Sequence, residues 1–162
     1  MQIGDLTQDV ADISRDLTIA RASLERIEDA LWGVAEDVLL VDLQDLGCRI
    51  YTFITTLRYL LEAAARHRKQ VIVLDRPNPI GGCLIEGNCL DPEYRSFVGR
   101  YPIPMRHGLT IGEIAKLFNG PFGIGCDLTV IPMEGWRRDM RFEETGLPWV
   151  APSPNLPTPR SP

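Results

Sequence analysis

The stretch Val71-Ile-Val-Leu-Asp75-Arg-Pro-Asn-Pro-Ile-Gly-Gly82 decides how this chain folds. It begins with an apolar run that has the composition of a buried strand, and the following turn places acidic, basic and amide side chains at the strand's carboxyl end. Open α/β sheets bind their ligands at that edge. Because Arg76 and Asn78 each precede a proline, both are held extended and lose little freedom on binding.

The same turn also has a purely structural interpretation. In that case Asp75 caps a neighbouring backbone amide and Arg76 pairs with Asp75. The turn alone leaves both interpretations open, and the blocks around it favour a ligand site.

Upstream of this turn, the sequence predicts a complete strand, helix and strand unit. The apolar run Val38-Leu-Leu-Val41 is typical of a strand covered on both faces. A helix is expected over residues 51–68, with an apolar face at Phe53, Ile54, Leu57, Leu60, Leu61 and Ala64. The two strands should be parallel with a right-handed crossover, so the acidic loops after them, with Asp42, Asp45 and Asp75, should open on one edge.

Downstream, residues 77–108 are rich in proline and glycine and have little periodicity, which indicates a long functional connection. A short helix is expected over residues 110–118, where Thr110 and Glu113 have capping-box spacing, so Glu113 is interpreted as a cap. A third strand is predicted over residues 128–131. The proline-rich tail from residue 148 should form neither helix nor central strand.

The N-terminal part has a different pattern. Apolar residues recur at four-three spacing from Leu6 to Leu31, which predicts an amphipathic helical segment over residues 1–33. This helix either forms a coiled-coil seam, which would allow self-association, or lies on the chain's own core. The expected organisation is therefore this segment, an α/β core over residues 34–147, and the tail over residues 148–162.

Composition narrows the class of protein. The chain has 162 residues, 44% hydrophobic and 24% charged, which is typical of one globular domain. A net charge of -5 argues against nucleic-acid partners, and no apolar run approaches the ~20 residues of a membrane span. Without a secretory signal we expect a cytoplasmic chain. Its four cysteines form no C-x-x-C pair and only two histidines are present, so we expect reduced thiols and no metal site.

The loops near the predicted sheet edge suit a small anionic sugar. A guanidinium binds a carboxylate through two hydrogen bonds, and flat aromatic side chains suit sugar rings. The arginines are Arg49, Arg76, Arg106, Arg137 and Arg138, and the aromatic residues are Tyr51, Tyr101 and Trp136. For any single arginine, a surface salt bridge stays the alternative.

Carboxylates in the same loops offer acid–base chemistry. Asp42, Asp45, Asp75 and Glu86 can supply the pair of carboxyl groups that a glycosidase holds about 5 to 9.5 Å apart. His107 either orients such an acid or ligand, or satisfies a backbone carbonyl. The sequence lacks G-x-G-x-x-G, P-loop and G-x-S-x-G motifs, which disfavours dinucleotide, nucleoside-triphosphate and serine-hydrolase chemistry.

Seven blocks stand in a fixed order along residues 42–158. The first two are Asp42-Leu-Gln-Asp45-Leu-Gly-Cys-Arg49-Ile-Tyr51-Thr52 and Asp75-Arg-Pro-Asn-Pro-Ile-Gly-Gly82. The other five are Glu86-Gly87, Ser96-Phe-Val-Gly99, Tyr101-Pro-Ile-Pro-Met-Arg106-His-Gly-Leu-Thr110, Met133-Glu-Gly-Trp-Arg-Arg138 and Pro152-Ser-Pro-Asn-Leu-Pro-Thr158. Together they resemble the exo-β-N-acetylmuramidases of NamZ type, long catalogued only as a domain of unknown function.

The resemblance implies a Rossmann-like parallel sheet flanked by helices, and hydrolytic removal of non-reducing terminal N-acetylmuramic acid from peptidoglycan fragments without a cofactor. It implies proton transfer by Asp45 or Glu86. It also implies that Arg49, Arg76 and Arg106 bind the sugar's carboxylate and that Trp136 packs on its ring. The remaining motif positions expected to bind substrate are Tyr51, Asp75, Asn78, His107 and Asn155.

The chain departs from this family at both flanks. Members carry an upstream Gly-Pro-Glu-His-Gly-like loop, and residues 1–36 contain nothing like it. They also continue beyond the Pro-Ser-Pro-Asn block, and they are often exported. We therefore expect an incomplete domain, for which the alternative function is a catalytically silent fragment that keeps anionic-sugar binding or associates through its N-terminal helix.

Overall fold

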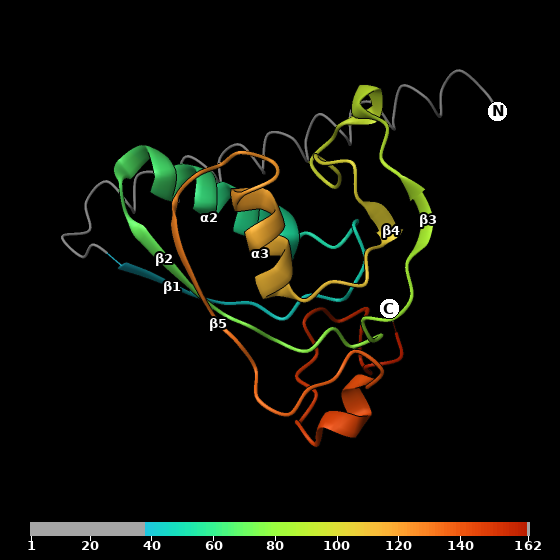
Figure 1. Ribbon diagram of the computed structural model, residues 1–162. Helices are drawn as coiled ribbons and strands as arrows, with labels where there is room; N and C mark the ends of the chain where they lie inside the picture. Colours follow the sequence, from blue (N-terminus) through green and yellow to red (C-terminus); the bar gives the residue numbers. More distant parts are fainter. Residues whose placement is uncertain (1–37, 162) are drawn as a thin grey trace, which may run out of the picture. The chain divides into compact units, whose positions relative to one another are not determined.

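The computed structural model describes residues 38–161 (Figure 1). The amphipathic helix expected over residues 1–33 lies outside the described residues. Within the described part, no helix is both long and apolar enough to cross a membrane.

A three-stranded parallel sheet forms the centre of the fold. Strands β1 (Val38–Asp42), β2 (Gln70–Leu74) and β5 (Asp127–Ile131) lie in the order β1-β2-β5. Val41 pairs with Val73, and Val73 in turn with Val130. The predicted parallel β-α-β unit and the third strand are confirmed, and all three strands end at the same edge.

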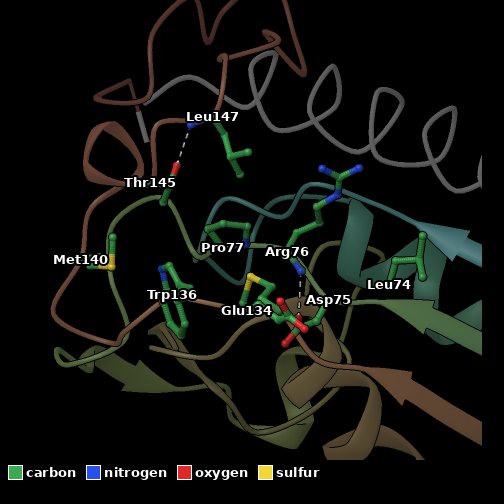
Figure 2. Close-up of a pocket in the computed structure, with 11 residues that line it drawn as sticks. Leu74, Asp75, Arg76, Pro77, Glu134, Trp136, Met140, Thr145 and Leu147 are labelled. Atoms are coloured by element: carbon green, nitrogen blue, oxygen red, sulfur yellow. Dashed lines mark hydrogen bonds between the residues drawn. The ribbon is translucent and has the colours of Figure 1, made fainter.

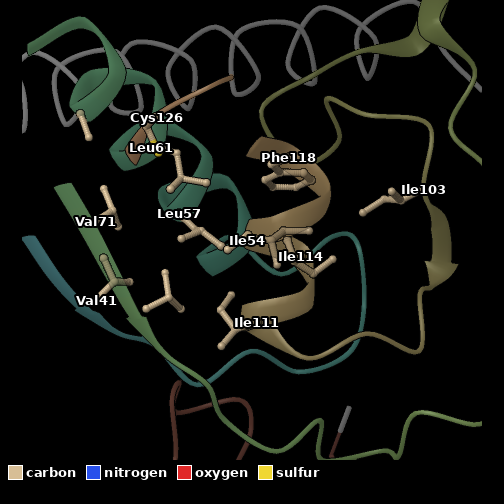
Figure 3. Packing of buried hydrophobic residues seen from close by; sticks show 13 residues of the cluster. Val41, Ile54, Leu57, Leu61, Val71, Ile103, Ile111, Ile114, Phe118 and Cys126 are labelled. Carbon is tan, nitrogen blue, oxygen red and sulfur yellow. The ribbon is translucent and has the colours of Figure 1, made fainter. Parts of the chain in front are cut away.

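Two helices cover one face of this sheet and enclose the core. Helix α2 (Phe53–His67) and helix α3 (Ile111–Asn119) pack on each other and on β2 (Figure 3). Leu57, Leu61 and Ile114 are fully buried there against Val71 and Val73. Each such side chain stabilises the fold by about 1.5 to 3 kcal/mol through burial.

Helix α2 is shorter than the sequence predicts. It begins at Phe53, two residues after the expected start, and ends before Arg68, which adopts a left-handed conformation with φ of 55°. The Arg68 amide donates to the carbonyl groups of Ala64 and Ala65, which closes the last turn.

The other face of the sheet differs from the expectation for β1. The sequence indicates a strand covered on both faces, but Val38 is 45% and Leu40 is 66% exposed. Because both helices lie on one face, only Leu39 and Val41 of this strand pack toward the core.

A small antiparallel arm interrupts the connection between β2 and α3. Strands β3 (Glu86–Cys89) and β4 (Pro104–Arg106) pair with each other, and the 3-10 turn η1 (Pro92–Tyr94) lies between them. The arm is joined to the main sheet through the loop after β1, because Arg49 donates its amide to Met105 and His107 donates its amide to Gly47. The sequence predicts a long functional connection here and no strands.

The chain after β5 runs along the carboxyl edge of the sheet. It contains the short 3-10 helix η2 (Phe142–Thr145), followed by the proline-rich segment. As predicted, residues 148–161 form neither helix nor strand.

Candidate functional site

A cleft of about 370 Å³ lies at the carboxyl ends of the parallel strands (Figure 2). Residues 74–77, at the end of β2 and in the turn after it, form one wall, and residues from the segment after β5 form the other. We call it the edge cleft. Its lining is Leu74, Asp75, Arg76, Pro77, Met133, Glu134, Gly135, Trp136, Met140, Thr145 and Leu147.

Arg76 is the cation of the edge cleft, and Asp42 holds it. Its Nε and Nη2 atoms donate to the two carboxylate oxygens of Asp42 at 2.6 and 2.5 Å. Both side chains are less than half exposed, and the hydrogen bond from Arg76 lowers the pKa of the Asp42 carboxyl group. The guanidinium is thus fixed at the cleft in the two-pronged geometry that carboxylates prefer.

Asp75 lines the cleft, but its carboxylate is bound to helix α3. Its Oδ1 atom accepts hydrogen bonds from the amides of Arg76 and Gly112, and Oδ2 accepts one from the Thr110 hydroxyl. The structural interpretation of the turn therefore describes Asp75, which caps a neighbouring amide. It does not describe Arg76, whose side chain pairs with Asp42 and not with Asp75.

Thr110 and Glu113 form the predicted capping box at the start of α3. The Thr110 hydroxyl accepts from the Glu113 amide, and the Glu113 carboxylate accepts from the Thr110 amide. Glu113 also pairs with Arg138, whose guanidinium donates to the carbonyl groups of Gly82 and Gly108. Arg138 therefore fastens the turn after β2 to the start of α3.

Trp136 supplies the flat surface of the edge cleft. It follows β5 and lies between Met140 and the wall formed by residues 74–77 (Figure 2). Its indole N–H group is buried and has no hydrogen-bond partner in the described part of the chain. Apolar faces with a few convergent polar groups are what small-ligand sites require.

Other motif residues are buried away from the edge cleft, around the loop after β1, which is hydrogen-bonded to β4 and to His107. We call Asp45, Arg49, Asn78 and His107 the inner polar cluster, because each is at most 7% exposed. Asp45 Oδ2 accepts from the Gly47 amide at 2.8 Å and lies 3.3 Å from His107 Nε2. His107 Nδ1 accepts from the Leu109 amide, which places the proton of the neutral imidazole on Nε2, facing Asp45.

Arg49 and Asn78 make their hydrogen bonds to backbone groups. One Arg49 nitrogen donates to the carbonyl groups of Asn88 and Ile103, on the two sides of the arm. Asn78 donates to the Leu109 carbonyl and accepts from the Ile80 amide. Both side chains therefore connect separate loops through hydrogen bonds.

Glu86 and Arg106 form a cross-strand ion pair on the arm. The two residues are register partners in β3 and β4, and their side chains approach to 2.6 Å. Arg106 also donates to the Ile80 carbonyl at 2.5 Å, whereas the Glu86 side chain is 61% exposed. Arg106 and His107 are consecutive, so adjacent residues contact the two carboxylates expected to transfer protons.

Two further predicted substrate residues lie near the proline-rich segment. The Tyr51 hydroxyl donates to the Pro152 carbonyl at 3.3 Å, and burial together with the nearby Asp45 charge raises the pKa of Tyr51. Asn155 is exposed and donates its amide to the Ser153 hydroxyl. Neither lines the edge cleft.

The structure thus brings Asp75, Arg76 and Trp136 together in the edge cleft and places the other predicted residues elsewhere. The sequence prediction omitted Glu134, Met140 and Leu147 from the site. Glu134 stands two residues before Trp136 in the block from Met133 to Arg138, and its place in that block was the available signal. Among residues 38–161, no group of histidine, cysteine and acidic side chains is arranged to hold a metal ion.

Comparisons with known proteins identify the family to which the chain is similar. Residues 21–160 match the family described as exo-beta-N-acetylmuramidase NamZ, N-terminal. The chain is 57% identical over 122 residues to the peptidoglycan beta-N-acetylmuramidase NamZ of Bacillus subtilis (strain 168), which covers 75% of this chain and 30% of that protein.

Solved structures of two proteins have a similar fold. A crystal structure of a DUF1343 family protein from Bacteroides fragilis NCTC 9343 superposes with a TM-score of 0.74 at 50% identity, covering 77% of this chain and 33% of that one. A second DUF1343 protein from the same organism gives a TM-score of 0.66 at 39% identity, covering 75% and 34%. The chain therefore spans about a third of the length of these relatives.

Proposed function

The chain belongs to the family of NamZ exo-β-N-acetylmuramidase N-terminal regions, and on that premise we propose that its edge cleft binds the terminal N-acetylmuramic acid of peptidoglycan fragments for hydrolytic release. The relative from Bacillus subtilis is named for β-N-acetylmuramidase action on peptidoglycan. Because the chain spans 30% of that protein, the activity is proposed here from the residues that the chain retains.

The observation that carries this proposal is the pairing of Arg76 with Trp136 in one cleft. N-acetylmuramic acid has a lactyl carboxylate on an amphipathic ring, so its recognition needs one cation and one flat apolar surface. Arg76 presents a guanidinium already aligned on a carboxylate, that of Asp42. Trp136 supplies the flat surface across the cleft. Exchanging the Asp42 carboxylate for that of the sugar would keep the same two-pronged geometry.

Hydrolysis needs two carboxyl groups beside the glycosidic bond, one of them protonated. We propose Glu86 as the general base that activates water, because its ion pair with Arg106 favours the ionised carboxylate and its side chain is exposed on the arm. Asp45 is the second carboxylate, oriented by His107 and the Gly47 amide. No cofactor is required, since water is the only co-reactant.

A second candidate function is binding of the anionic sugar without turnover. One observation favours it: neither Asp45 nor Glu86 lines the edge cleft, and Asp45 is 3% exposed. In this case the chain would recognise N-acetylmuramic acid and release nothing.

The test combines binding and turnover on the purified, folded chain. Titration with N-acetylmuramic acid should give saturable binding that Arg76→Gln and Trp136→Ala each weaken by about tenfold or more, whereas the exposed control Arg95→Gln leaves it unchanged. Incubation with the MurNAc-β-1,4-GlcNAc disaccharide should release N-acetylmuramic acid, and Glu86→Gln should abolish that release. Binding without release would select the second function. No binding of either sugar would refute both.

A further inference from the structure

A second cleft, of about 270 Å³, adjoins the edge cleft. Asp42, the last residue of β1, and Gln44, in the loop after it, form one side, and the segment from Phe142 to Val150 forms the other. Arg76 and Leu147 line both clefts. The two clefts therefore meet at the Asp42–Arg76 ion pair.

The aromatic wall of the second cleft is fixed in place. Trp149 donates its indole N–H group to the Leu156 carbonyl at 3.2 Å, and its ring meets Phe142 edge-on, at a centroid distance of 4.9 Å and an angle of 81°. Phe142 is itself 4% exposed. A ring held in this way loses little entropy when a ligand packs on it.

Gln44 is held as firmly on the opposite side. Its side-chain Nε2 atom donates to the carbonyl groups of Asp45 and Pro77 at 2.8 and 2.9 Å. No residue in the described part of the chain donates to its Oε1 atom, so one amide oxygen remains available to a ligand N–H or O–H group.

The charges and size of the second cleft indicate which ligand it suits. Arg76 is the only basic residue in the lining of the second cleft, and it is already paired with Asp42. The exposed apolar side chains of Leu147 and Val150 also line this cleft. A second anionic group would meet the Asp42 carboxylate there, whereas a neutral sugar ring would not. The volume is below the roughly 300 to 1,000 Å³ of pockets that hold drug-sized ligands, and so suits a single ring.

We propose that the second cleft is the binding subsite for the neutral amino sugar that is β-1,4-linked to the terminal N-acetylmuramic acid. This inference rests on the proposed function, in which the edge cleft holds the acidic sugar. The disaccharide then lies across the junction, with Trp136 and Trp149 each packing on one ring and the linkage near the Asp42 and Arg76 side chains.

The indole signals of the labelled chain give a separate readout for each cleft. The sequence has three tryptophans, and Trp→Phe variants assign their ¹⁵N indole resonances. N-acetylmuramic acid alone should shift the Trp136 signal, whereas MurNAc-β-1,4-GlcNAc should shift both Trp136 and Trp149 and bind about tenfold more tightly. Release of N-acetylmuramic acid is monitored in the same samples.

Two lining variants and one matched control complete the test. Gln44→Ala and Val150→Ser should each remove at least about half of the disaccharide's advantage and leave affinity for the monosaccharide unchanged. Val98→Ser, at another exposed valine that lines neither cleft, should change neither affinity.

Each outcome separates this inference from the proposed function. A Trp136 shift with N-acetylmuramic acid, but no tighter binding and no Trp149 shift with the disaccharide, would overturn the second subsite alone. Equal losses for both sugars in the Gln44 and Val150 variants would overturn it as well. Failure of both sugars to bind would overturn the subsite and the proposed function together.

Discussion

The edge cleft and the inner polar cluster contain similar residue types, but their side chains have different roles. In the inner polar cluster, Arg49 and Asn78 are buried and bind backbone carbonyl groups. At the edge cleft, Arg76 is 41% exposed and its partner is another side chain, Asp42. A guanidinium bound to carbonyl groups is part of the fold, whereas one bound to a half-exposed carboxylate can exchange that partner for a ligand.

The largest loss of stability is expected from a substitution at Gly47, which supports the inner polar cluster. Gly47 has a φ of +79°, and an added Cβ atom would lie 2.4 Å from Asn78 Oδ1. Gly47→Ala should therefore cost about 3 kcal/mol of unfolding free energy through backbone strain and overpacking. The measurement is the urea denaturation midpoint and slope.

Gly125→Ala is the matched control for this change. Gly125 has a φ of +72°, and no heavy atom lies within 4 Å of an added Cβ. It should cost about 1 kcal/mol, from the backbone conformation alone. Equal losses at Gly47 and Gly125 would show that contact with Asn78 contributes nothing.

A smaller loss is expected from Arg49→Met, which keeps most of the side chain's length and removes the donors. The carbonyl groups of Asn88 and Ile103 would then lose a charged partner, at a cost of about 2 kcal/mol. Arg137→Met, at a side chain that is 68% exposed, should cost less than about 0.5 kcal/mol. Thermal unfolding of both variants checks this, and similar losses would contradict the structural role of Arg49.

Loss of the pair at the edge cleft should affect stability less and ligand binding more than loss of the Arg49 hydrogen bonds. Asp42→Asn removes a half-exposed ion pair, which is worth less than about 1 kcal/mol. Because Arg76 is freed and a competing negative charge is lost, affinity for N-acetylmuramic acid should rise by about threefold. Weaker binding in isothermal titration would show that Asp42 supports the ligand and does not compete with it.

The same variant has a defined pH dependence. The pKa of Asp42 is lowered in the folded chain, so the pair stabilises the fold above the unfolded carboxyl pKa and the contribution is lost as pH falls through the folded value. The stability difference between wild type and Asp42→Asn should therefore be largest at neutral pH and fade below about pH 4. A difference that grows on acidification would contradict this assignment.

The smallest expected effect is at Glu134, an exposed acid in the lining of the edge cleft. Glu134→Gln should leave stability within about 0.5 kcal/mol of wild type. Removing one negative charge should tighten binding of the anionic sugar by about twofold, an effect that disappears at high salt. Titration at low and high ionic strength measures both expectations.

Much of the fold was predictable because its signals are local. The apolar runs of β1, β2 and β5 and the periodicity of α2 lie within single segments, as does the Thr110 and Glu113 capping box. Strands β3 and β4 were missed because they are short and contain Gly87 and Pro104. What holds them is the Glu86–Arg106 pair and the backbone of the loop after β1, and a local pattern records neither.

The residue types of the candidate site were predictable from the sequence, but the partners of their side chains were less so. The turn after β2 was identified as presenting Asp75 and Arg76 to a ligand. The structure sends the Asp75 carboxylate to the Gly112 amide and Arg76 to Asp42, partners that stand 37 and 34 positions away in the chain. A charged residue in a motif block therefore indicates that its side chain makes a polar interaction, but only the fold shows which group is its partner.

The order of strands in the parallel sheet also has a kinetic consequence. Strand β2 pairs with β1 at residues 73 and 41, but with β5 at residues 73 and 130, across the whole arm and helix α3. Contacts between residues distant in sequence close late, because the intervening chain must lose entropy first. The β1-α2-β2 unit should therefore acquire hydrogen-exchange protection early in refolding, and the wall of the edge cleft that follows β5 should be completed last.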